Sequence, residues 1–307
     1  MARLDHQAQS GLPYALAAHA VWGSMPIYLL LVRDVPALEY VAWRIVFTMP
    51  LCVAILAWRG NLTEIRAVAR DPRTMLALLG SSATIGINWF LYVWAIQSGY
   101  IYAASLGYYI LPLVMMLLAL VVLGERLTRR QWGAVCLAGA GVAALSAGAL
   151  TTLWLSLSMG VSFAIYGLLR KTVAAGPLAG LTLETLILLP VAIAVIVWFA
   201  ATPGGTVLGR DGWETFGIVW GGPMTAIPLL MFATAARRMP YSVIGFLQFI
   251  SPTIVFLLGL FLFGEELQPA QLACFIALWA GVALFVWDML RGNRVPATDA
   301  EALRGGS

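Results

Sequence analysis

The sequence that decides the fold is ILPLVMMLLALVVLGERLTRRQWGAVCLAGAGVA, residues 110–143. When Ile110 is placed on Ile250, this stretch superposes on ISPTIVFLLGLFLFGEELQPAQLACFIALWAGVA, residues 250–283, with 13 identities in 34 positions. The identities are not confined to aliphatic residues, because the helix breaker Pro112 falls on Pro252. The chain therefore contains an internal repeat, and each copy includes two long apolar segments.

The composition is that of a membrane protein. Of the 307 residues, 61% are hydrophobic and only 10% are charged, whereas soluble domains carry about 25% charged residues. A hydrocarbon core of about 30 Å needs about 20 apolar residues per helix. The apolar runs predict ten spans, which leave no room for a soluble catalytic domain: 11–32, 36–58, 74–97, 101–123, 130–149, 151–169, 177–200, 213–236, 240–263 and 269–290.

The repeat divides these spans into two halves of five. Because five is odd, the second half enters the membrane from the opposite side, and its loop charge changes accordingly from Gly124-Glu125-Arg126 to Gly264-Glu265-Glu266. Inverted repeats are typical of secondary transporters, with a substrate site near the midplane between the halves. A duplication retained for packing alone is the alternative.

The basic residues predict the orientation. With the N-terminus inside, 15 of the 18 lysines and arginines lie in cytoplasmic segments, while Arg33 and Arg210 lie outside and Arg44 lies within a span. This distribution follows the positive-inside rule. The formal net charge of +4 is therefore a topology signal, and we expect no nucleic-acid partner.

Seven motifs spread over the chain resemble one family. They are Trp22-Gly23 with Pro26 and Tyr28, Asn88-Trp89, Ser105-Leu106-Gly107-Tyr108, Gly124-Glu125-Arg126, Tyr166-Gly167-Leu168-Leu169-Arg170-Lys171, Leu183-Glu184-Thr185 and Gln248-Phe249-Ile250-Ser251-Pro252. In this order they resemble the RarD branch of the EamA transporters, in the drug/metabolite transporter superfamily. The sequence departs from the family pattern at Trp43, Leu111 and His19, so no family role is carried to those positions.

The resemblance implies an all-α integral membrane protein of the bacterial inner membrane, with both termini in the cytoplasm. Its ten transmembrane helices would form two inverted five-helix repeats around a central cavity lined by spans 1 to 4 and 6 to 9. The expected organisation is a cytoplasmic segment 1–10, a first repeat 11–149, a second repeat 150–290 and a cytoplasmic, disordered tail 291–307.

Arg44 is the first candidate site residue. It lies eight residues into the second span, about 12 Å below the surface at 1.5 Å per residue. Because a charge at that depth costs several kcal/mol unless it is solvated or paired, we expect it to face a cavity or a carboxylate. It would capture an anionic substrate or form an outer gate; the alternative is a side chain that snorkels to the periphery.

Glu184 lies at the equivalent point of the seventh span, where the register of the repeat places the counterpart of Arg44. The two opposite charges would form either a midplane ion pair or two separate gates. A carboxyl group in a low dielectric is also a candidate carrier of a coupling proton. A purely structural ion pair fits the same residues.

The remaining candidates are polar or aromatic residues within spans. For His19 we weigh a satisfied core group against a proton relay, and for Asn88 and Tyr92 a cavity lining against hydrogen bonds that hold helices together. Further candidates for substrate contact are Trp22, Tyr108, Tyr109, Tyr166, Phe246 and Gln248. Helix breakers that would act as hinges or in packing are Pro26, Pro112, Pro228 and Pro252.

We expect no enzyme, cofactor or metal site. Only two histidines are present, and Cys52, Cys136 and Cys274 each stand alone in an apolar stretch. The expected function is alternating-access transport, in the outward direction, of a small organic metabolite or amphipathic compound such as an amino acid. A non-transporting scaffold or receptor is the alternative. We expect a monomer in the lipid bilayer, with a dimer and a coupling proton left open.

Overall fold

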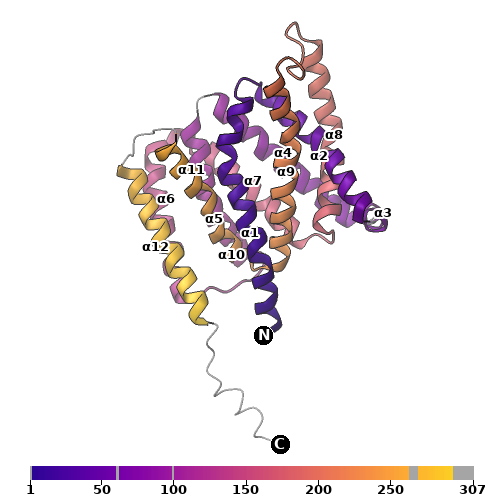
Figure 1. The fold of residues 1–307 in the computed structure, drawn as a ribbon. Helices are drawn as coiled ribbons and strands as arrows, with labels where there is room; N and C mark the ends of the chain where they lie inside the picture. Colours follow the sequence, from indigo (N-terminus) through magenta and orange to yellow (C-terminus); the bar gives the residue numbers. More distant parts are fainter. Residues whose placement is uncertain (1, 60–61, 99, 263–268, 293–307) are drawn as a thin grey trace, which may run out of the picture. The chain divides into compact units, whose positions relative to one another are not determined.

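The protein is helical throughout the part of the chain that the computed structural model describes, which is residues 2–59, 62–98, 100–262 and 269–292. Figure 1 shows the helices. The α-helices are α1 (Ala2–Leu29), α2 (Ala37–Arg59), α3 (Leu62–Arg70), α4 (Pro72–Gln97), α5 (Ile101–Val121), α6 (Arg129–Ser146), α7 (Leu153–Thr172), α8 (Pro177–Ala201), α9 (Gly212–Arg238), α10 (Tyr241–Leu247), α11 (Ile250–Phe261) and α12 (Pro269–Gly292). Two short 3-10 helices are η1 (Leu30–Val32) and η2 (Ala147–Thr152).

The predicted spans correspond to these helices. Within the described residues, nine helical segments are long and apolar enough to cross a membrane. The remaining predicted span, the fifth (130–149), corresponds to α6, an 18-residue helix whose first residues are Arg129, Arg130 and Gln131. The short junction between the fifth and sixth spans is the 3-10 helix η2. The prediction of an all-α membrane protein is confirmed.

The ninth predicted span is interrupted. The apolar run predicts one helix over 240–263, but the structure has α10 and α11, with a break at Gln248 and Phe249. Pro252 explains the break, because its nitrogen carries no hydrogen and its ring excludes the carbonyl of the residue four positions earlier. The other three candidate hinge prolines lie inside the continuous helices α1, α5 and α9.

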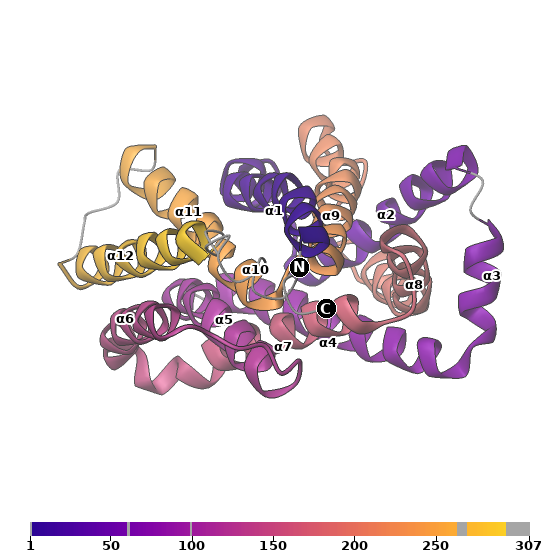
Figure 2. The ribbon, with the colours of Figure 1, turned by 90° about the horizontal axis from the view of Figure 1, so that it is seen from below.

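Contacts divide the chain into two compact units, which we describe separately. Unit 1 comprises residues 1–125 and 146–266, and unit 2 comprises residues 126–145 and 267–307. Within unit 1, α1 packs beside α9, α7 packs beside α4 and α5, and α2 packs beside α8 and α9 (Figure 2). The α1/α9 pair and the α7/α4 pair occupy matching places in the two sequence halves.

Unit 1 has two ends. At the end that we call the Arg170 end, Lys171 donates through Nζ to the carbonyls of Ala236 and Met239, at 3.0 and 2.6 Å. The opposite end, which we call the Glu39 end, includes the start of α2 and the loop before α9, where Val207 donates to Glu39 at 2.9 Å. The loop charge Glu125 lies at the Arg170 end and accepts the backbone N–H of Tyr241 at 2.7 Å. Its repeat counterpart in Gly264-Glu265-Glu266 lies outside the described residues.

Small residues allow the helices of unit 1 to approach closely. A Cβ atom at Gly107 of α5 would lie 3.1 Å from the carbonyl oxygen of Ser156, and one at Gly160 of α7 would lie 3.2 Å from the carbonyl oxygen of Gly107. At the crossing of α2 and α9, a side chain at Gly222 would collide with the carbonyl oxygen of Phe47. Close packing of this kind is how helices associate in lipid.

Helix α3 is an element that the sequence analysis missed. The apolar runs leave a charged loop between the second and third spans, but residues 62–70 form a helix. Ile65 and Val68 lie three positions apart and pack against Leu78 and Val173, so the helix has an apolar stripe. Asp71 follows it and accepts the backbone N–H of Thr74 at 3.2 Å; a hydrogen bond from the Thr74 hydroxyl lowers the pKa of Asp71.

Unit 2 is built from α6 and α12. A Cβ atom at Gly281 of α12 would lie 2.9 Å from the carbonyl oxygen of Ala134 on α6. At one end of this pair, Asp288 accepts the hydroxyl of Thr128 at 2.6 Å and lies 3.6 Å from Nη1 of Arg130. The two helices belong to different sequence halves, so unit 2 joins the last helix of each half.

Candidate functional site

Arg44 of α2 is buried, with 8% of the residue exposed. Its Nε donates to Oγ1 of Thr225 at 2.8 Å, and its Cζ lies 5.5 Å from the ring centroid of Tyr40 and 5.2 Å from that of Trp89. No carboxylate among the described residues comes within 4.0 Å of its nitrogens. A hydroxyl and two aromatic faces stabilise the guanidinium, but no described residue provides a counter-ion within 4.0 Å.

The partners of Arg44 are held in place by hydrogen bonds. The hydroxyl of Thr225 donates to the carbonyl of Gly221 at 2.7 Å, so its lone pairs are free to accept from Arg44. The hydroxyl of Tyr40 donates to that of Tyr28 at 2.9 Å, which donates to the carbonyl of Gly217 at 2.6 Å. Contacts between α1, α2 and α9 therefore fix the surroundings of the guanidinium.

Glu39, which sequence reasoning missed, is buried near the same end. Its Oε1 accepts from the indole of Trp43 at 3.2 Å, from the hydroxyl of Thr206 at 2.5 Å and from the backbone N–H of Val207 at 2.9 Å. These donors satisfy one oxygen of the carboxylate and attach the loop before α9 to α2. The sequence signal was weak, because an acidic residue in the first turn of a helix is usually a solvated partner of the helix dipole.

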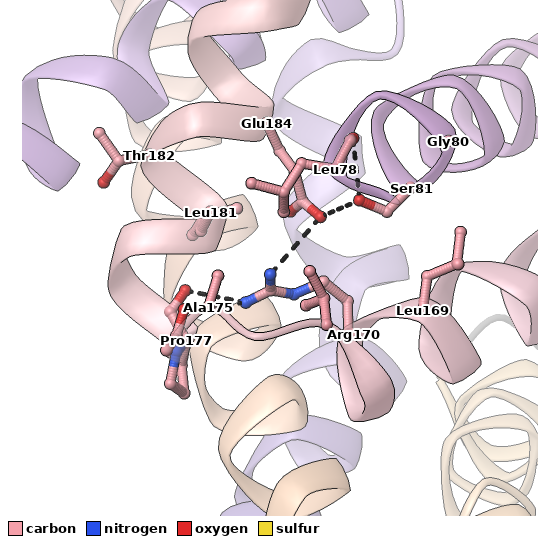
Figure 3. Close-up of polar contacts among 12 residues, drawn as sticks. Leu78, Gly80, Ser81, Leu169, Arg170, Ala175, Pro177, Leu181, Thr182 and Glu184 are labelled. Carbon is pink, nitrogen blue, oxygen red and sulfur yellow. Dashed lines mark hydrogen bonds and ion pairs between the residues drawn. The ribbon is translucent and has the colours of Figure 1, made fainter. Parts of the chain in front are cut away.

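Glu184 of α8 is buried at the Arg170 end of the interior. Its Oε1 lies 3.7 Å from Nη1 of Arg170 and accepts a hydrogen bond from the hydroxyl of Ser81 (Figure 3). Its Oε2 has no hydrogen-bond partner among the described residues. Arg44 and Glu184 therefore do not pair with each other; each has its own surroundings.

The position of Arg170 differs from the sequence-based expectation, which placed it beyond the end of a span, in a cytoplasmic segment. It is 0% exposed and lies in the last turn of α7. Nη2 donates to the carbonyls of Gly176 and Pro177, at 3.4 and 3.1 Å, whereas Nε and Nη1 have no hydrogen-bond partner among the described residues. The sequence concealed this role, because a basic dipeptide at the end of a span is typical of the positive-inside rule.

A small cavity lies between the two charged sites. Its volume is about 10 Å³, and its walls come from α2, α4, α7, α8 and α9: Ile45, Thr48, Ile85, Trp89, Tyr166, Leu181, Glu184, Thr185, Leu188 and Leu229. Trp89 contacts both the cavity and the Arg44 guanidinium, and Glu184 contacts both the cavity and Arg170. A space of this size holds about one water molecule, so this cavity is too small for a metabolite.

His19 and Trp22 belong to the packed core of unit 1. The hydroxyl of Ser251 donates to the carbonyl of His19 at 3.1 Å, so Nδ1 of His19, 3.2 Å from that hydroxyl, is the donor to it. The Trp22 ring lies 5.5 Å from Phe163 and 5.6 Å from Phe232, centroid to centroid. This geometry favours a core role for both residues, and neither lines the cavity.

Asn88 links helices α4 and α7. Its Nδ2 donates to the carbonyl of Met159 at 2.9 Å and to the hydroxyl of Ser162 at 3.2 Å. Tyr92, one turn further along α4, meets Tyr108 of α5 edge to face, with centroids 5.6 Å apart. The geometry of Asn88 supports the alternative in which it holds helices together.

The other candidates are spread over unit 1. Tyr166 is the only one of the predicted aromatics that lines the cavity. Phe246 and Gln248 lie at the α10/α11 break and are buried, and Nε2 of Gln248 has no hydrogen-bond partner among the described residues. Tyr109 is partly buried on α5. Of the candidates, Tyr166 and Glu184 therefore line the cavity. Arg44 contacts its wall only through Trp89, and the other candidates do not line the cavity.

A bundle of apolar, membrane-length helices with buried charges near an interior cavity fits a multi-pass membrane transporter. Comparison with known sequences agrees, since the sequence model of the EamA-like transporter family matches residues 9–147. The chain belongs to this family, in its RarD branch.

The relatives match along nearly the whole chain. An "uncharacterized transporter" of Pseudomonas aeruginosa is 38% identical over 289 residues, which are 92% of this chain and 95% of the relative. "Protein RarD" of Salmonella typhi is 36% identical over 296 residues, 94% of this chain and 98% of the relative. A solved structure titled only "Crystal structure of protein" has a TM-score of 0.71 and 18% identity, and the match covers 90% of this chain and 96% of that one; this likeness concerns the fold alone.

Proposed function

We propose that this membrane transporter is a secondary exporter of small organic compounds that carry a carboxylate, such as amino acids, and that it works by alternating access. The observation that carries the proposal is Arg44, a buried guanidinium with no carboxylate partner among the described residues. A permanently charged side chain that is desolvated without a counter-ion costs several kcal/mol. A substrate carboxylate would supply the missing charge through a charge-assisted hydrogen bond.

The surroundings of Arg44 support a substrate that is also apolar in part. The guanidinium lies over Tyr40 and Trp89, and Trp89 forms part of the cavity wall. A compound that enters between Trp89 and Leu188 would place an apolar group against these walls and its carboxylate toward Arg44. Amphipathic metabolites of amino-acid size have both features.

The closed cavity supports alternating access. At about 10 Å³ it admits about one water molecule, so a metabolite binds only after helices move apart. The Arg170–Glu184 pair holds α7 and α8 together on one side of the cavity, and the break before Pro252 provides a place where α10 and α11 bend. Opening at one end with closure at the other would expose the site to each side in turn.

The orientation and the membrane are part of the same proposal. The positive-inside distribution places the Arg170 end and both termini in the cytoplasm of a bacterial cell, at the inner membrane. Arg44 then lies nearer the outer face, and the Arg170–Glu184 pair closes the cytoplasmic side. Glu184 is the candidate carrier of a coupling proton, because Oε2 has no hydrogen-bond partner among the described residues and the side chain lines the cavity.

Counterflow in proteoliposomes tests the proposal. Vesicles preloaded with an unlabelled amino acid or amphipathic monocarboxylate should accumulate the same compound in labelled form when they contain the protein, and Arg44→Ala should abolish the accumulation. Undiminished flux in both Arg44→Ala and Glu184→Gln would remove the two residues from the mechanism. Correctly folded protein that gives no substrate-dependent flux over the panel would favour the non-transporting scaffold or receptor.

A further inference from the structure

Helix α3 lies where the chain leaves and re-enters the membrane. Helix α2 has 23 residues, about 34 Å at 1.5 Å per residue, which is enough to cross a hydrocarbon core of about 30 Å. Arg59 ends this helix and Pro72 begins the next span. The intervening helix α3 therefore lies at the level of the lipid headgroups, and Figure 2 shows it crossing the periphery of unit 1 from α2 to α4, past α8.

The two faces of α3 differ. Ile65 and Val68 pack inward against residues of α4 and of the loop between α7 and α8. Thr63, Arg66 and Arg70 lie at spacings of three and four, so they share the opposite face, and all three are exposed. The apolar face packs against the rest of unit 1, and the basic face points away from unit 1.

Four arginines make this surface strongly positive. Arg59, Arg66, Arg70 and Arg73 are exposed, and none of them forms an ion pair within 4.0 Å among the described residues. We call these four residues the α3 basic surface. The adjacent Trp58, with 85% of the residue exposed, is the type of aromatic residue that anchors a helix end at the headgroup level.

Among the described residues, the two carboxylates in this stretch form no ion pair within 4.0 Å with the α3 basic surface, although the charge of Arg73 contributes to the lowered pKa of Asp71. Oε1 of Glu64 accepts the backbone N–H of Gly176 at 2.9 Å. Asp71 accepts backbone N–H groups at the start of α4, including that of Thr74 at 3.2 Å. Both carboxylates are therefore occupied by backbone donors of their own unit, whereas the arginines face outward.

We propose that the α3 basic surface binds the headgroups of anionic phospholipids, such as phosphatidylglycerol. Arginine forks suit phosphate oxygens, and a cluster of basic residues at the end of a span is attracted to an anionic leaflet. The position of α3 at the headgroup level favours lipid over a soluble phosphate, because the lipid is present there at high local concentration.

Lipid bound at α3 restricts the motion of the α7–α8 loop, whose Gly176 carbonyl accepts a hydrogen bond from Arg170. Glu64 of α3 accepts from Gly176, and the carbonyl of Gly176 accepts from Nη2 of Arg170 at 3.4 Å. One residue of the α7–α8 loop thus bonds both to the lipid-facing helix and to the cation of the Arg170–Glu184 pair. Anchoring α3 on the membrane restricts this loop, and so favours the closed arrangement at the Arg170 end.

Native mass spectrometry of the full chain tests lipid binding. The protein is extracted from vesicles of phosphatidylcholine and phosphatidylglycerol, and the ratio of the two lipids that it retains is measured. Wild type should retain phosphatidylglycerol preferentially, and Arg66→Gln with Arg70→Gln should lower the retained ratio about 25-fold, since each basic residue near an anionic surface contributes about a fivefold preference. The matched control is Arg33→Gln with Arg210→Gln, which removes two exposed arginines outside this surface and should leave the ratio unchanged.

An equal ratio in wild type and the α3 double variant, or an equal loss in the control, would overturn the proposal. So would displacement of phosphatidylglycerol by millimolar inorganic phosphate, which would reassign the surface to a soluble anion. Hydrogen exchange tests the link to Arg170: amides of residues 173–176 should exchange more slowly in vesicles with phosphatidylglycerol than in phosphatidylcholine alone. The difference should vanish in the α3 double variant; a loop indifferent to lipid would refute the link.

Discussion

Arg44 and Glu184 occupy equivalent positions in the two halves of the chain, but only Glu184 has an oppositely charged partner among the described residues. Glu184 has a cation beside it, since Nη1 of Arg170 lies 3.7 Å from Oε1. Arg44 has a hydroxyl and two aromatic rings. The repeat explains the difference: in the register that relates Tyr28 to Tyr166, the position of Arg170 corresponds to Val32, an apolar residue.

Under the proposed function, the two sites therefore perform different tasks at equivalent positions of the sequence repeat. The second half supplies both members of an ion pair, and that pair can close the interior without any ligand. In the first half, no carboxylate among the described residues lies within 4.0 Å of the Arg44 nitrogens, so under the proposed function the substrate supplies the balancing charge. The 3.7 Å between Nη1 of Arg170 and Oε1 of Glu184 is too long for a hydrogen bond, and a buried pair with such geometry offsets little of its desolvation cost. In the proposed alternating access, such a pair is suited to breaking when the Arg170 end opens.

The largest expected effect distinguishes the paired site from the unpaired one. Arg170→Leu leaves the Glu184 carboxylate in the interior without a counter-ion, and we expect it to lower the free energy of unfolding by about 3–5 kcal/mol. Replacing both residues by leucine should recover most of the loss, because no charge is then stranded. Unfolding in a denaturing detergent, followed by tryptophan fluorescence, measures both values.

Arg44→Leu is the control for that comparison. It strands no carboxylate, and the loss of one hydrogen bond and two aromatic contacts is offset by the removal of a desolvated charge, so we expect a cost of no more than about 1 kcal/mol. A cost as large as that of Arg170→Leu would mean that Arg44 has a structural counter-ion after all, and the contrast between the two halves would fail.

The next effect concerns recognition of the substrate charge. Wild type should bind a carboxylate substrate about 10- to 100-fold more tightly than its carboxamide, since a hydrogen bond to a charged group contributes about 1.5–3 kcal/mol. Arg44→Gln should remove this preference, whereas Glu184→Gln should leave it in place, because Glu184 faces Arg170. Inhibition of counterflow by the two compounds provides the measurement; a preference that survives in Arg44→Gln would place anion recognition elsewhere.

Most of the fold was predictable because the repeat and the apolar runs are long. The spans agree with the helices to within a few residues at most ends, since twenty apolar residues in lipid have few alternatives to a helix. Two local features were missed. Helix α3 has only nine residues, and its apolar stripe of Ile65 and Val68 is concealed among charges. The break at Gln248 and Phe249 is local too, and Pro252 was an available signal for it.

Much less of the site was predictable. Arg44 and Glu184 stand out because charges in spans are costly, and both are buried. Their partners could not be identified, because Thr225, Ser81 and Trp89 come from other helices and no sequence spacing relates them. The burial of Arg170 could not be predicted for a physical reason. A basic residue at the end of a span satisfies the positive-inside rule whether its side chain points into solvent or packs against the next helix.

A third prediction tests the space around Arg170. Gly180 on α8 has no room for a side chain, because a Cβ atom there would overlap the guanidinium of Arg170. Gly180→Ala should displace Arg170 from Glu184 and cost about 1–3 kcal/mol of unfolding free energy, measured as for Arg170→Leu. In the Arg170→Leu background the added cost should be much smaller. Gly139→Ala is the control, since a Cβ at Gly139 meets no atom within 4 Å.

The smallest effect concerns the aromatic face that stands between Arg44 and the cavity. Trp89→Phe keeps a ring near the guanidinium but provides a weaker cation–π contact, so we expect the affinity for a carboxylate substrate to change by about two- to fivefold. Tyr40→Phe keeps its ring and loses the hydroxyl bond to Tyr28, and it should alter stability more than affinity. Loss of counterflow in Trp89→Phe would mean that the indole has a second role besides its contact with the guanidinium. Its bulk would then separate Arg44 from the cavity in the closed state. Trp89 would in that case contribute both to substrate recognition and to gating.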